Sequence, residues 1–214
     1  MPSTPTAATF DYKLQMLSGL NTESFAPSFN DLPVDPYING AAFRRRRFSR
    51  YTGQASNLQR LEHKYFVQSS KINKLAGDIK RDFPELDDNL KDLPEFQRIV
   101  DVFVDFSKID PMVTEMGVHQ IRIVASKNEK GSPAPEGIHQ DGFDFVGIFC
   151  IKRDKISGGE TQLFRDKDGE PIFDKILQPA EFVMVNDRTL YHYASNVAPT
   201  SDDDGVRDVF VITA

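Results

Sequence analysis

The sequence predicts an α+β chain in which a β-sandwich or jelly roll is backed by helices from the N-terminal half. Apolar residues recur at helical spacing before residue 110, whereas short runs rich in Val, Ile, Phe and Tyr follow one another from Val118 onward. Helices followed by a series of short strands are typical of this architecture. The length of 214 residues favours a single domain, and 39% hydrophobic with 27% charged residues excludes an intrinsically disordered chain.

In residues 10–110 we expect mainly helical support with one strand, preceded by a disordered start rich in Ser, Thr, Pro and Ala over residues 1–9. We expect helices over Phe10–Leu20, Asn57–Ser70 and Pro94–Ser107. The expected strand is Ala42–Thr52. The third helix has the clearest pattern, because Phe96, Val100 and Phe103 fall on one face at helical spacing.

Residues 111–214 are expected to form the β core that carries the functional site. The predicted strands are Val118–Ala125, Phe145–Ile151, Thr161–Phe164, Glu181–Val185, Leu190–Tyr193 and Asp208–Thr213. Turn signals separate them, among them Ser157-Gly158-Gly159 and the stretch from Ser201 to Gly205.

Charge and composition restrict the partners and the compartment. A net charge of -6 disfavours a general nucleic-acid-binding role, because such binding neutralises several phosphates with Lys and Arg. The single cysteine, Cys150, lies in an apolar run, so no intramolecular disulfide can form and a reducing compartment fits. The N-terminus lacks the features of a signal peptide and no apolar stretch is long enough to span a membrane. We therefore expect a cytoplasmic protein without a membrane partner.

A candidate metal site is indicated by His139-Gln140-Asp141. On an extended backbone residues two apart project to the same side, so His139 and Asp141 could bind one ion, although such a pair is common by chance. His192 lies on a later predicted strand, which a jelly roll could bring alongside. Three ligands on one face of a metal leave open positions for a bidentate 2-oxo acid and dioxygen, and Arg207 could clamp the far carboxylate of that acid.

The same residues have plainer interpretations. His139 and Asp141 could be a loop histidine and its acidic neighbour, and His192, flanked by two tyrosines, could be a packed core residue. Arg207 could form a surface ion pair with an aspartate of the stretch 202–204. The order and combination of the motifs, rather than any one of them, favours the metal site.

Further polar residues are candidates for contacts with a substrate. Gln120 and Arg122 share one face of a predicted strand and could hold polar groups, against the alternative of ion pairs on the sheet. Asp144 could meet a substrate ammonium, and Thr161, after the double glycine, could contact a ligand. The remaining histidines, His63 and His119, are expected to be structural.

Five arginines between residues 44 and 50 can be interpreted in three ways. They could form a solvated strand edge, a nucleic-acid patch, or a carboxylate clamp made by alternate residues such as Arg44 or Arg46. No aromatic stacking motif of a nucleic-acid reader follows them, which favours the clamp.

Taken together, these motifs resemble a known enzyme family over roughly residues 40 to 214. The motifs that carry the resemblance are His139–Val146, Ile156–Thr161, His192, Arg207, Val118–Arg122 and Ser49-Arg50-Tyr51 with Arg44 and Arg46 before it. They are similar to the bacterial and fungal 2-oxoglutarate-Fe(II) dioxygenase family that includes the free L-isoleucine 4-hydroxylase. The resemblance implies a double-stranded β-helix, which is a cupin-like jelly roll.

The resemblance also implies cofactors and a reaction. His139, Asp141 and His192 would hold Fe(II), and Arg207 would bind 2-oxoglutarate. With O2 as the oxidant, such an enzyme hydroxylates a C–H bond of a small molecule, here a free L-amino acid, and releases succinate and CO2. An aspartate at position 141 disfavours halogenation, for which relatives leave that metal position to a halide.

Two alternatives stay open at this stage. One is a hydroxylase of a peptide or another small metabolite, and the other is a non-catalytic metal- or nucleic-acid-binding module that uses Arg44–Arg50. The sequence leaves open which compound is the substrate, which carbon is attacked and whether the chain forms a homodimer.

Overall fold

The computed structural model describes residues 10–38, 42–70 and 77–214. Helices are few among these residues: α1 (Ala26–Asn30), α2 (Pro94–Ser107) and the 3-10 helices η1 (Thr22–Phe25), η2 (Ala55–Asn57) and η3 (Asp88–Asp92). In α2, Pro94 occupies the first turn, where its missing N–H costs nothing, and Lys108 ends the helix in a left-handed conformation. No helix in the described parts of the chain is long and apolar enough to cross a membrane.

Strands dominate the described chain and form one large and two small antiparallel sheets. The large sheet has seven strands in the order β1-β9-β5-β12-β4-β2-β3. Their bounds are β1 Tyr12–Met16, β2 Arg44–Thr52, β3 Gln59–Arg60, β4 Met116–Ala125, β5 Phe145–Asp154, β9 Glu181–Asn186 and β12 Gly205–Thr213.

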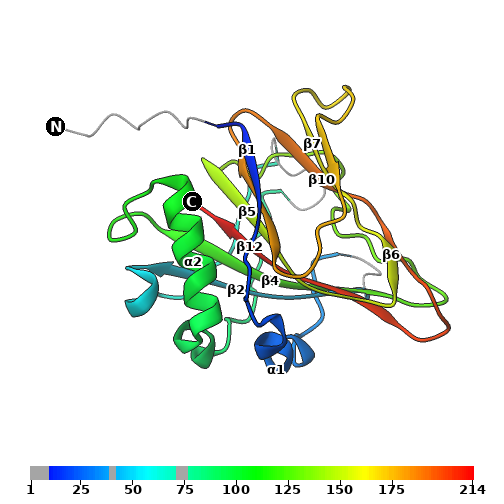
Figure 1. Cartoon of the computed structure of the whole chain (residues 1–214), viewed down its shortest axis with the longest axis horizontal. Helices are drawn as coiled ribbons and strands as arrows, with labels where there is room; N and C mark the ends of the chain where they lie inside the picture. The colour runs from blue at the N-terminus through cyan, green and yellow to red at the C-terminus, as the bar shows by residue number, and fades with distance from the viewer. Residues whose placement is uncertain (1–9, 39–41, 71–76) are drawn as a thin grey trace.

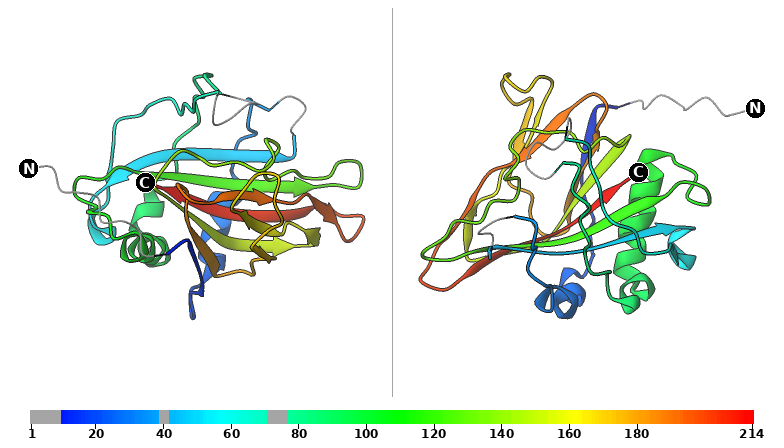
Figure 2. Two further views of the ribbon diagram at one scale, coloured as in Figure 1. Left: turned by 90° about the horizontal axis from the view of Figure 1, so that it is seen from above. Right: turned by 180° about the vertical axis from the view of Figure 1, so that it is seen from behind.

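The two small sheets lie opposite the large one (Figures 1 and 2). One contains three strands in the order β10-β7-β8, and the other pairs β11 with β6. Their bounds are β6 Ile156–Gly158, β7 Thr161–Phe164, β8 Phe173–Lys175, β10 Tyr191–Ala194 and β11 Val197–Pro199. From β5 onward the chain passes from the large sheet (β5) to the small sheets (β6 to β8), back to the large sheet (β9), again to the small sheets (β10 and β11) and finally to the large sheet (β12), which is the arrangement of a double-stranded β-helix. The predicted jelly roll is thereby confirmed.

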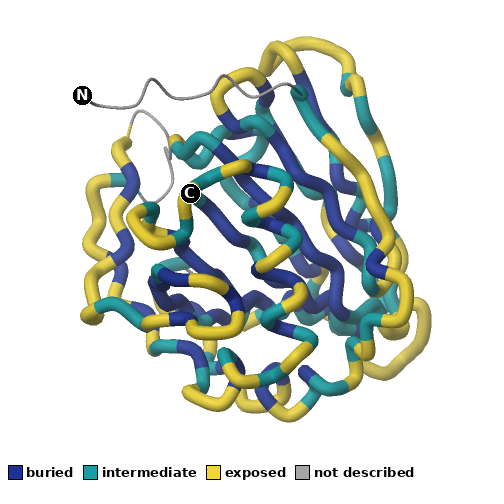
Figure 3. Tube along the Cα trace, turned by 60° about the vertical axis from the view of Figure 1, so that its left-hand side comes forward, coloured by how far each residue is buried: buried dark blue, intermediate teal, exposed yellow. Residues whose placement is uncertain are grey.

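Alternation along β5 shows how the layers are held together. Phe145, Phe149 and Ile151 pack in the cluster that includes residues of helix α2. The alternate residues Val146, Ile148 and Cys150 pack between the sheets with Leu163 of β7. Figure 3 shows the buried strands of this body surrounded by exposed connecting segments. The large sheet thus has one face covered by helices, with the other directed toward the small sheets and a cavity.

Two predicted helices are wrong. The segment Phe10–Leu20 contains β1, which adds to the edge of the large sheet by pairing with β9. The segment Asn57–Ser70 contains the end of η2, the short strand β3 and extended chain, with Phe66 bridged to Arg81. The N-terminal half is therefore not mainly helical.

The other predicted elements agree with the structure. Helix Pro94–Ser107 and strand Thr161–Phe164 have the predicted bounds, and the strand expected over Ala42–Thr52 begins at Arg44. The predicted disorder of residues 1–9 lies outside the described residues.

Candidate metal centre and its cavity

The two histidines of the predicted metal site face each other across an antiparallel β-bridge. The His139 N–H donates to the carbonyl of His192 at 3.0 Å, and the His192 N–H donates to the carbonyl of His139 at 2.8 Å. Nδ1 of His139 lies 2.8 Å from the carbonyl oxygen of Gly137, which only a protonated nitrogen can satisfy. This tautomer leaves the lone pair of His139 on Nε2, where a metal ion can bind it.

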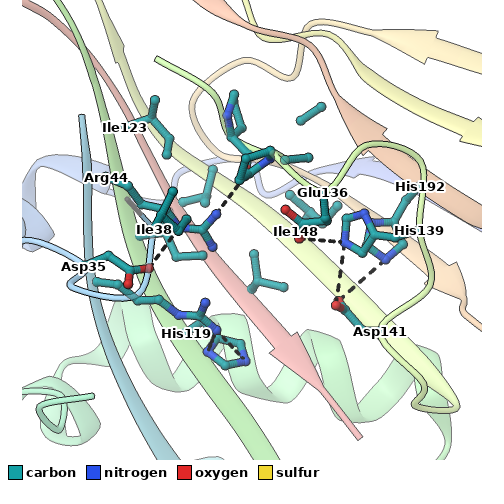
Figure 4. Close-up of a pocket in the computed structure, with 18 of the residues that line it drawn as sticks. Asp35, Ile38, Arg44, His119, Ile123, Glu136, His139, Asp141, Ile148 and His192 are labelled. Atoms are coloured by element: carbon teal, nitrogen blue, oxygen red, sulfur yellow. Dashed lines mark hydrogen bonds and ion pairs between the residues drawn. The ribbon is translucent and has the colours of Figure 1, made fainter. Parts of the chain in front are cut away.

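Asp141 completes a cluster with both imidazoles (Figure 4). One ligand atom from each of the three residues lies within 4.8 Å of the others. His139 Nε2 is 3.7 Å from Asp141 Oδ1, and His192 Nε2 is 3.5 Å from Asp141 Oδ2. Metal–ligand bonds of about 2.0–2.2 Å place neighbouring ligand atoms about 3 Å apart, so these three donors would move closer together around a bound ion. Two neutral imidazoles and a carboxylate suit a divalent transition metal.

Asp187 holds this cluster from behind. Its Oδ2 accepts hydrogen bonds from the backbone N–H groups of Asp141, Gly142 and Phe143 at 2.9, 2.7 and 3.2 Å, and its Oδ1 lies 3.3 Å from His192 Nε2. Burial raises the pKa of Asp187, but the His192 contact and the backbone donors outweigh it and lower the pKa below its ordinary value. The sequence shows Asn186-Asp187 only as a turn signal, so this role was missed.

His192 is buried, and burial, the largest influence, lowers its pKa. Contact with Asp187 and the charge of Asp141 outweigh burial, so the pKa of His192 is raised above its ordinary value. Binding of a metal requires the neutral imidazole, and an ion would therefore displace this proton.

The predicted cofactor residue Arg207 lines the same cavity as the metal cluster. It comes from β12, is 4% exposed and forms no hydrogen bond or ion pair with any described residue. Burial and the nearby Arg153 lower the pKa of Arg207. Because an unpaired buried guanidinium is unfavourable, the cavity has a place for an anion beside it. An anionic cosubstrate with a metal-chelating end therefore fits these residues.

The cavity between the sheets brings basic residues to face the metal cluster. Arg44 and Arg46 of β2 line it, as expected for a clamp made by alternate residues, and Figure 4 shows Arg44, Asp35 and His119 across from the cluster. Arg44 is paired with Asp35 at 3.4 Å and donates to the carbonyl of Pro133. Apolar side chains fill the space between the two polar groups, among them Ile121, Ile123, Val146, Ile148, Val209 and Val211.

Two of the predicted substrate contacts lie on the face of β4 that is turned away from the cavity. Gln120 donates to Ser28 Oγ at 2.8 Å, and Arg122 forms two hydrogen bonds of 2.7 Å with Asp208, on the side that carries α1. The opposite face of β4 carries His119, Ile121 and Ile123 into the cavity. Strand alternation was predicted correctly, but the sequence could not indicate which face is directed inward.

The other two candidates are also outside the lining of the cavity. Asp144 forms an ion pair with Arg188 at the surface. Thr161 is buried between the sheets, and its hydroxyl oxygen has no hydrogen-bond partner among the described residues.

His119 is buried and neutral rather than a ligand of the metal cluster. It lies under Phe48 in a stacked arrangement, and its Nδ1 accepts a hydrogen bond of 2.6 Å from Arg46. Burial, followed by the charges of the surrounding arginines, lowers the pKa of His119 well below its ordinary value. His63, the other histidine expected to be structural, contacts Asp82 and Glu85 at the surface.

Three further residues of the cavity carried no recognisable signal in the sequence. Arg81 and Gln68 come from extended chain that was predicted as helix or left unassigned, and Glu136 follows a Pro-rich turn. Glu136 Oε1 lies 3.4 Å from His139 Nε2. Residues such as these have no local pattern because their function comes from distant segments meeting in space.

The arginine run on β2 does not form an open basic surface. The side chains of Arg44, Arg46 and Arg50 are buried, so a nucleic-acid backbone could not reach them. Arg47 is engaged by Asp31 and Asp87, and Arg50 is engaged by Glu115.

Comparisons with known proteins agree with this arrangement. Residues 26–213 match a family model described as 2OG-Fe dioxygenase. The chain is 23% identical to the 3(1)-hydroxy-L-isoleucine 4-dioxygenase of Pantoea ananatis (strain AJ13355), over 97% of this chain and 85% of that protein.

Solved structures show the same fold. A bsmA homolog from Methylobium petroleophilum PM1 has a TM-score of 0.75 and 25% identity, covering 89% of this chain and 79% of that one. IDO from Bacillus thuringiensis has a TM-score of 0.73 and 18% identity, covering 90% of this chain and 84% of that one. Because the family match spans both histidines, the aspartate and Arg207, the chain belongs to the 2-oxoglutarate-Fe(II) dioxygenases, enzymes that use non-haem Fe(II), 2-oxoglutarate and O2.

Proposed function

We propose that this dioxygenase hydroxylates an unactivated C–H bond of a free L-amino acid. The observation that carries the proposal is that the His139, Asp141 and His192 cluster shares one cavity with the unpaired guanidinium of Arg207. The balanced reaction consumes the substrate, 2-oxoglutarate and O2 and yields the alcohol, succinate and CO2.

Each of the four residues has a separate task. His139, Asp141 and His192 would hold Fe(II), and Arg207 would bind a carboxylate of 2-oxoglutarate. The bound iron and 2-oxoglutarate supply the oxidising chemistry. Asp187 keeps Asp141 oriented because its carboxylate accepts hydrogen bonds from the backbone N–H groups of Asp141 and Gly142. The apolar walls of the cavity exclude water from the reacting C–H bond.

The charges of the cavity support an amino-acid substrate. Basic side chains from β2 lie across the cavity from Glu136, an acidic residue that forms no ion pair with a Lys or Arg of the described chain. An amino acid carries one carboxylate and one ammonium group and so matches walls of both signs. The similarity to a hydroxy-isoleucine dioxygenase supports the same substrate class.

Chelation of 2-oxoglutarate is the first test. Anaerobic addition of Fe(II) and 2-oxoglutarate to the protein should produce the weak visible charge-transfer band of an iron-bound 2-oxo acid. Asp141→Ala and His192→Ala should abolish this band, whereas Asp168→Asn, an exposed acidic residue far from the cluster in the sequence, should retain it. A folded protein without the band would contradict the cofactor assignment.

Substrate class is the second test. Succinate release should be stimulated by one or more free L-amino acids from a panel of all common ones, with the hydroxylated product identified by mass spectrometry. If peptides stimulate succinate release and no free amino acid does, the enzyme is a peptide hydroxylase and the proposed substrate class is wrong.

A further inference from the structure

Arg46 and Arg81 are two buried cations of the cavity that have no acidic partner. Arg46 comes from β2, and its guanidinium contacts His119; Arg81 comes from the segment before η3, and its Nη2 donates to Gln68 Oε1 at 2.7 Å. Each is 5% exposed, and neither forms an ion pair. Every Asp and Glu of the sequence lies in the described ranges, and none of them forms an ion pair with either arginine; Asp35 and Asp141 act on both only from a longer distance.

Aromatic rings fix both guanidinium groups in the same place. The central carbon of Arg46 lies 4.4 Å from the ring centre of Phe83, and both arginines lie over Phe66, at 5.2 and 4.6 Å. Stacking of this kind holds the planar group in position and leaves its edge available for hydrogen bonds. The guanidinium groups of Arg46 and Arg81 are therefore both held against the ring of Phe66 and line the same cavity.

The electrostatic cost of this arrangement is visible in both side chains. Burial and the neighbouring Arg44 lower the pKa of Arg46 to about 9, and the same two causes lower the pKa of Arg81. With a pKa of about 9, Arg46 remains charged at neutral pH. A buried cation without a counter-ion is unfavourable, and an anion from outside the chain would remove this cost.

Gln68 connects this pair of arginines to the metal cluster. Its Oε1 accepts the hydrogen bond from Arg81, and its Nε2 donates to Asp141 Oδ1 at 3.0 Å. Only one amide group therefore separates the arginine pair from a ligand of the metal. An anion at Arg81 would belong to a molecule that also reaches the metal, rather than to one bound elsewhere.

We propose that Arg46 and Arg81 form the subsite that binds the carboxylate of the substrate. This assignment rests on the proposed function, because it identifies where the amino acid of that reaction is held. A single carboxylate fits better than a phosphate dianion, since Asp35, Glu136 and Asp141 line the same cavity and would repel a second negative charge. With the carboxylate held at the arginine pair, a carbon of the side chain lies toward the metal.

The test compares free amino acids with their carboxamides, which differ only in the charge and acceptors of the carboxyl group. Protein loaded with Zn(II), which has no redox chemistry, and 2-oxoglutarate is titrated with each L-amino acid and its carboxamide while thermal unfolding is followed. At least one free acid should stabilise the wild-type protein, and its carboxamide should bind about 30-fold or more weakly.

Variants assign the effect to the two arginines. Arg46→Met and Arg81→Met should each weaken binding of the free acid by about 30-fold or more and leave the weak binding of the carboxamide unchanged. Arg45→Met, on the opposite face of β2, is the matched control and should bind like the wild type. Arg81→Lys, which keeps the charge without the planar fork, should bind with intermediate affinity.

The outcomes separate this subsite from the proposed function. All variants should retain the charge-transfer band with Fe(II) and 2-oxoglutarate, since Arg207 and the metal cluster are intact. A free-acid preference that survives in both methionine variants would overturn the subsite alone. If no free acid stabilises a protein that forms the band, both the substrate class and the subsite are wrong, and absence of the band in the wild type would instead refute the cofactor assignment.

Discussion

At the residue scale, the polar groups around the cavity differ in whether the chain supplies their partners. Asp187 has its hydrogen bonds filled by backbone donors, whereas Arg207 has none from the described chain. A satisfied buried group is expected to support structure, and an unsatisfied one is expected to await a ligand. The two residues therefore predict different consequences of substitution.

Replacement of Arg207 should impair cofactor binding without loss of the fold. Arg207→Met removes the cation expected to pair with 2-oxoglutarate, and loss of a buried charge-assisted contact costs about 2–5 kcal/mol, or about 30-fold or more in affinity. Titration of the charge-transfer band with 2-oxoglutarate measures this change. The exposed residue Arg165 provides the control variant Arg165→Met, and an unchanged affinity in Arg207→Met would place the clamp elsewhere.

Replacement of Asp187 should weaken the metal site although the residue is not assigned as a ligand. Asp187→Asn keeps the shape but loses a charged acceptor for the N–H groups of Asp141 and Gly142, so Asp141 is held less firmly. Replacement of a residue that supports a metal ligand in this way usually lowers metal affinity by about 10–100-fold. Competition with a chelator measures the affinity, with Asp168→Asn as the control, and an equal affinity would show that Asp187 supports only the loop.

At the element scale, β12 has different tasks on its two faces. Arg207 is directed into the cavity, and the next residue, Asp208, is directed to the helical side and paired with Arg122 of β4. Burial, the largest influence, raises the pKa of Asp208 although Arg122 opposes it. This ion pair joins two neighbouring strands directly beside Arg207.

Breaking that pair should destabilise the protein. Arg122→Met leaves the Asp208 carboxylate buried without its partner, and the free energy of unfolding should fall by about 3–5 kcal/mol. Urea denaturation followed by circular dichroism measures the loss. The double variant Arg122→Met with Asp208→Asn should recover part of it, because no unpaired charge remains; equal stabilities of the single variant and the wild type would contradict the importance of the pair.

The elements also show what the sequence can and cannot predict. Helix α2 was predicted with its bounds because Pro94 and a clear apolar face define it locally. Strand β1 was predicted as helix, since its pairing with β9 depends on residues about 170 positions away that a local pattern does not contain. Short strands such as β6 and β8 were missed for the same reason.

The residues of the candidate site also differ in whether a local sequence pattern identifies them. His139, Asp141, His192 and Arg207 lie in motifs with a recognisable order, and the structure brings all four to one cavity. Gln68, Arg81 and Glu136 come from segments without a pattern, and only the folded chain brings them to the cluster. The inward face of β4 could not be chosen from the sequence because both of its faces are largely buried, one under helices and the other against the cavity.

At the scale of the whole molecule, the packed apolar layer around Cys150 between the sheets should stay closed to solvent while the protein is folded. Cys150 is fully buried in this layer, and burial raises the pKa of its thiol to about 11. Reaction with iodoacetamide requires both exposure and the thiolate, so the native protein should resist labelling.

Labelling of Cys150 should therefore report unfolding of the entire β-helix. The extent of modification after a short pulse should rise with urea at the same midpoint as the loss of circular dichroism. Labelling of a fully denatured sample serves as the positive control. Complete modification in buffer would show that the layer opens without global unfolding.

The backbone bridge between His139 and His192 has a consequence for how the enzyme acquires its ion. Main-chain hydrogen bonds hold these two positions opposite each other, so the strand pairing itself brings the two imidazoles together. We therefore expect that iron can be loaded after folding and removed again by a chelator without loss of the fold, which circular dichroism before and after chelation would measure. Occupancy is set by which divalent ion the surroundings supply, because imidazole and carboxylate donors accept several of them.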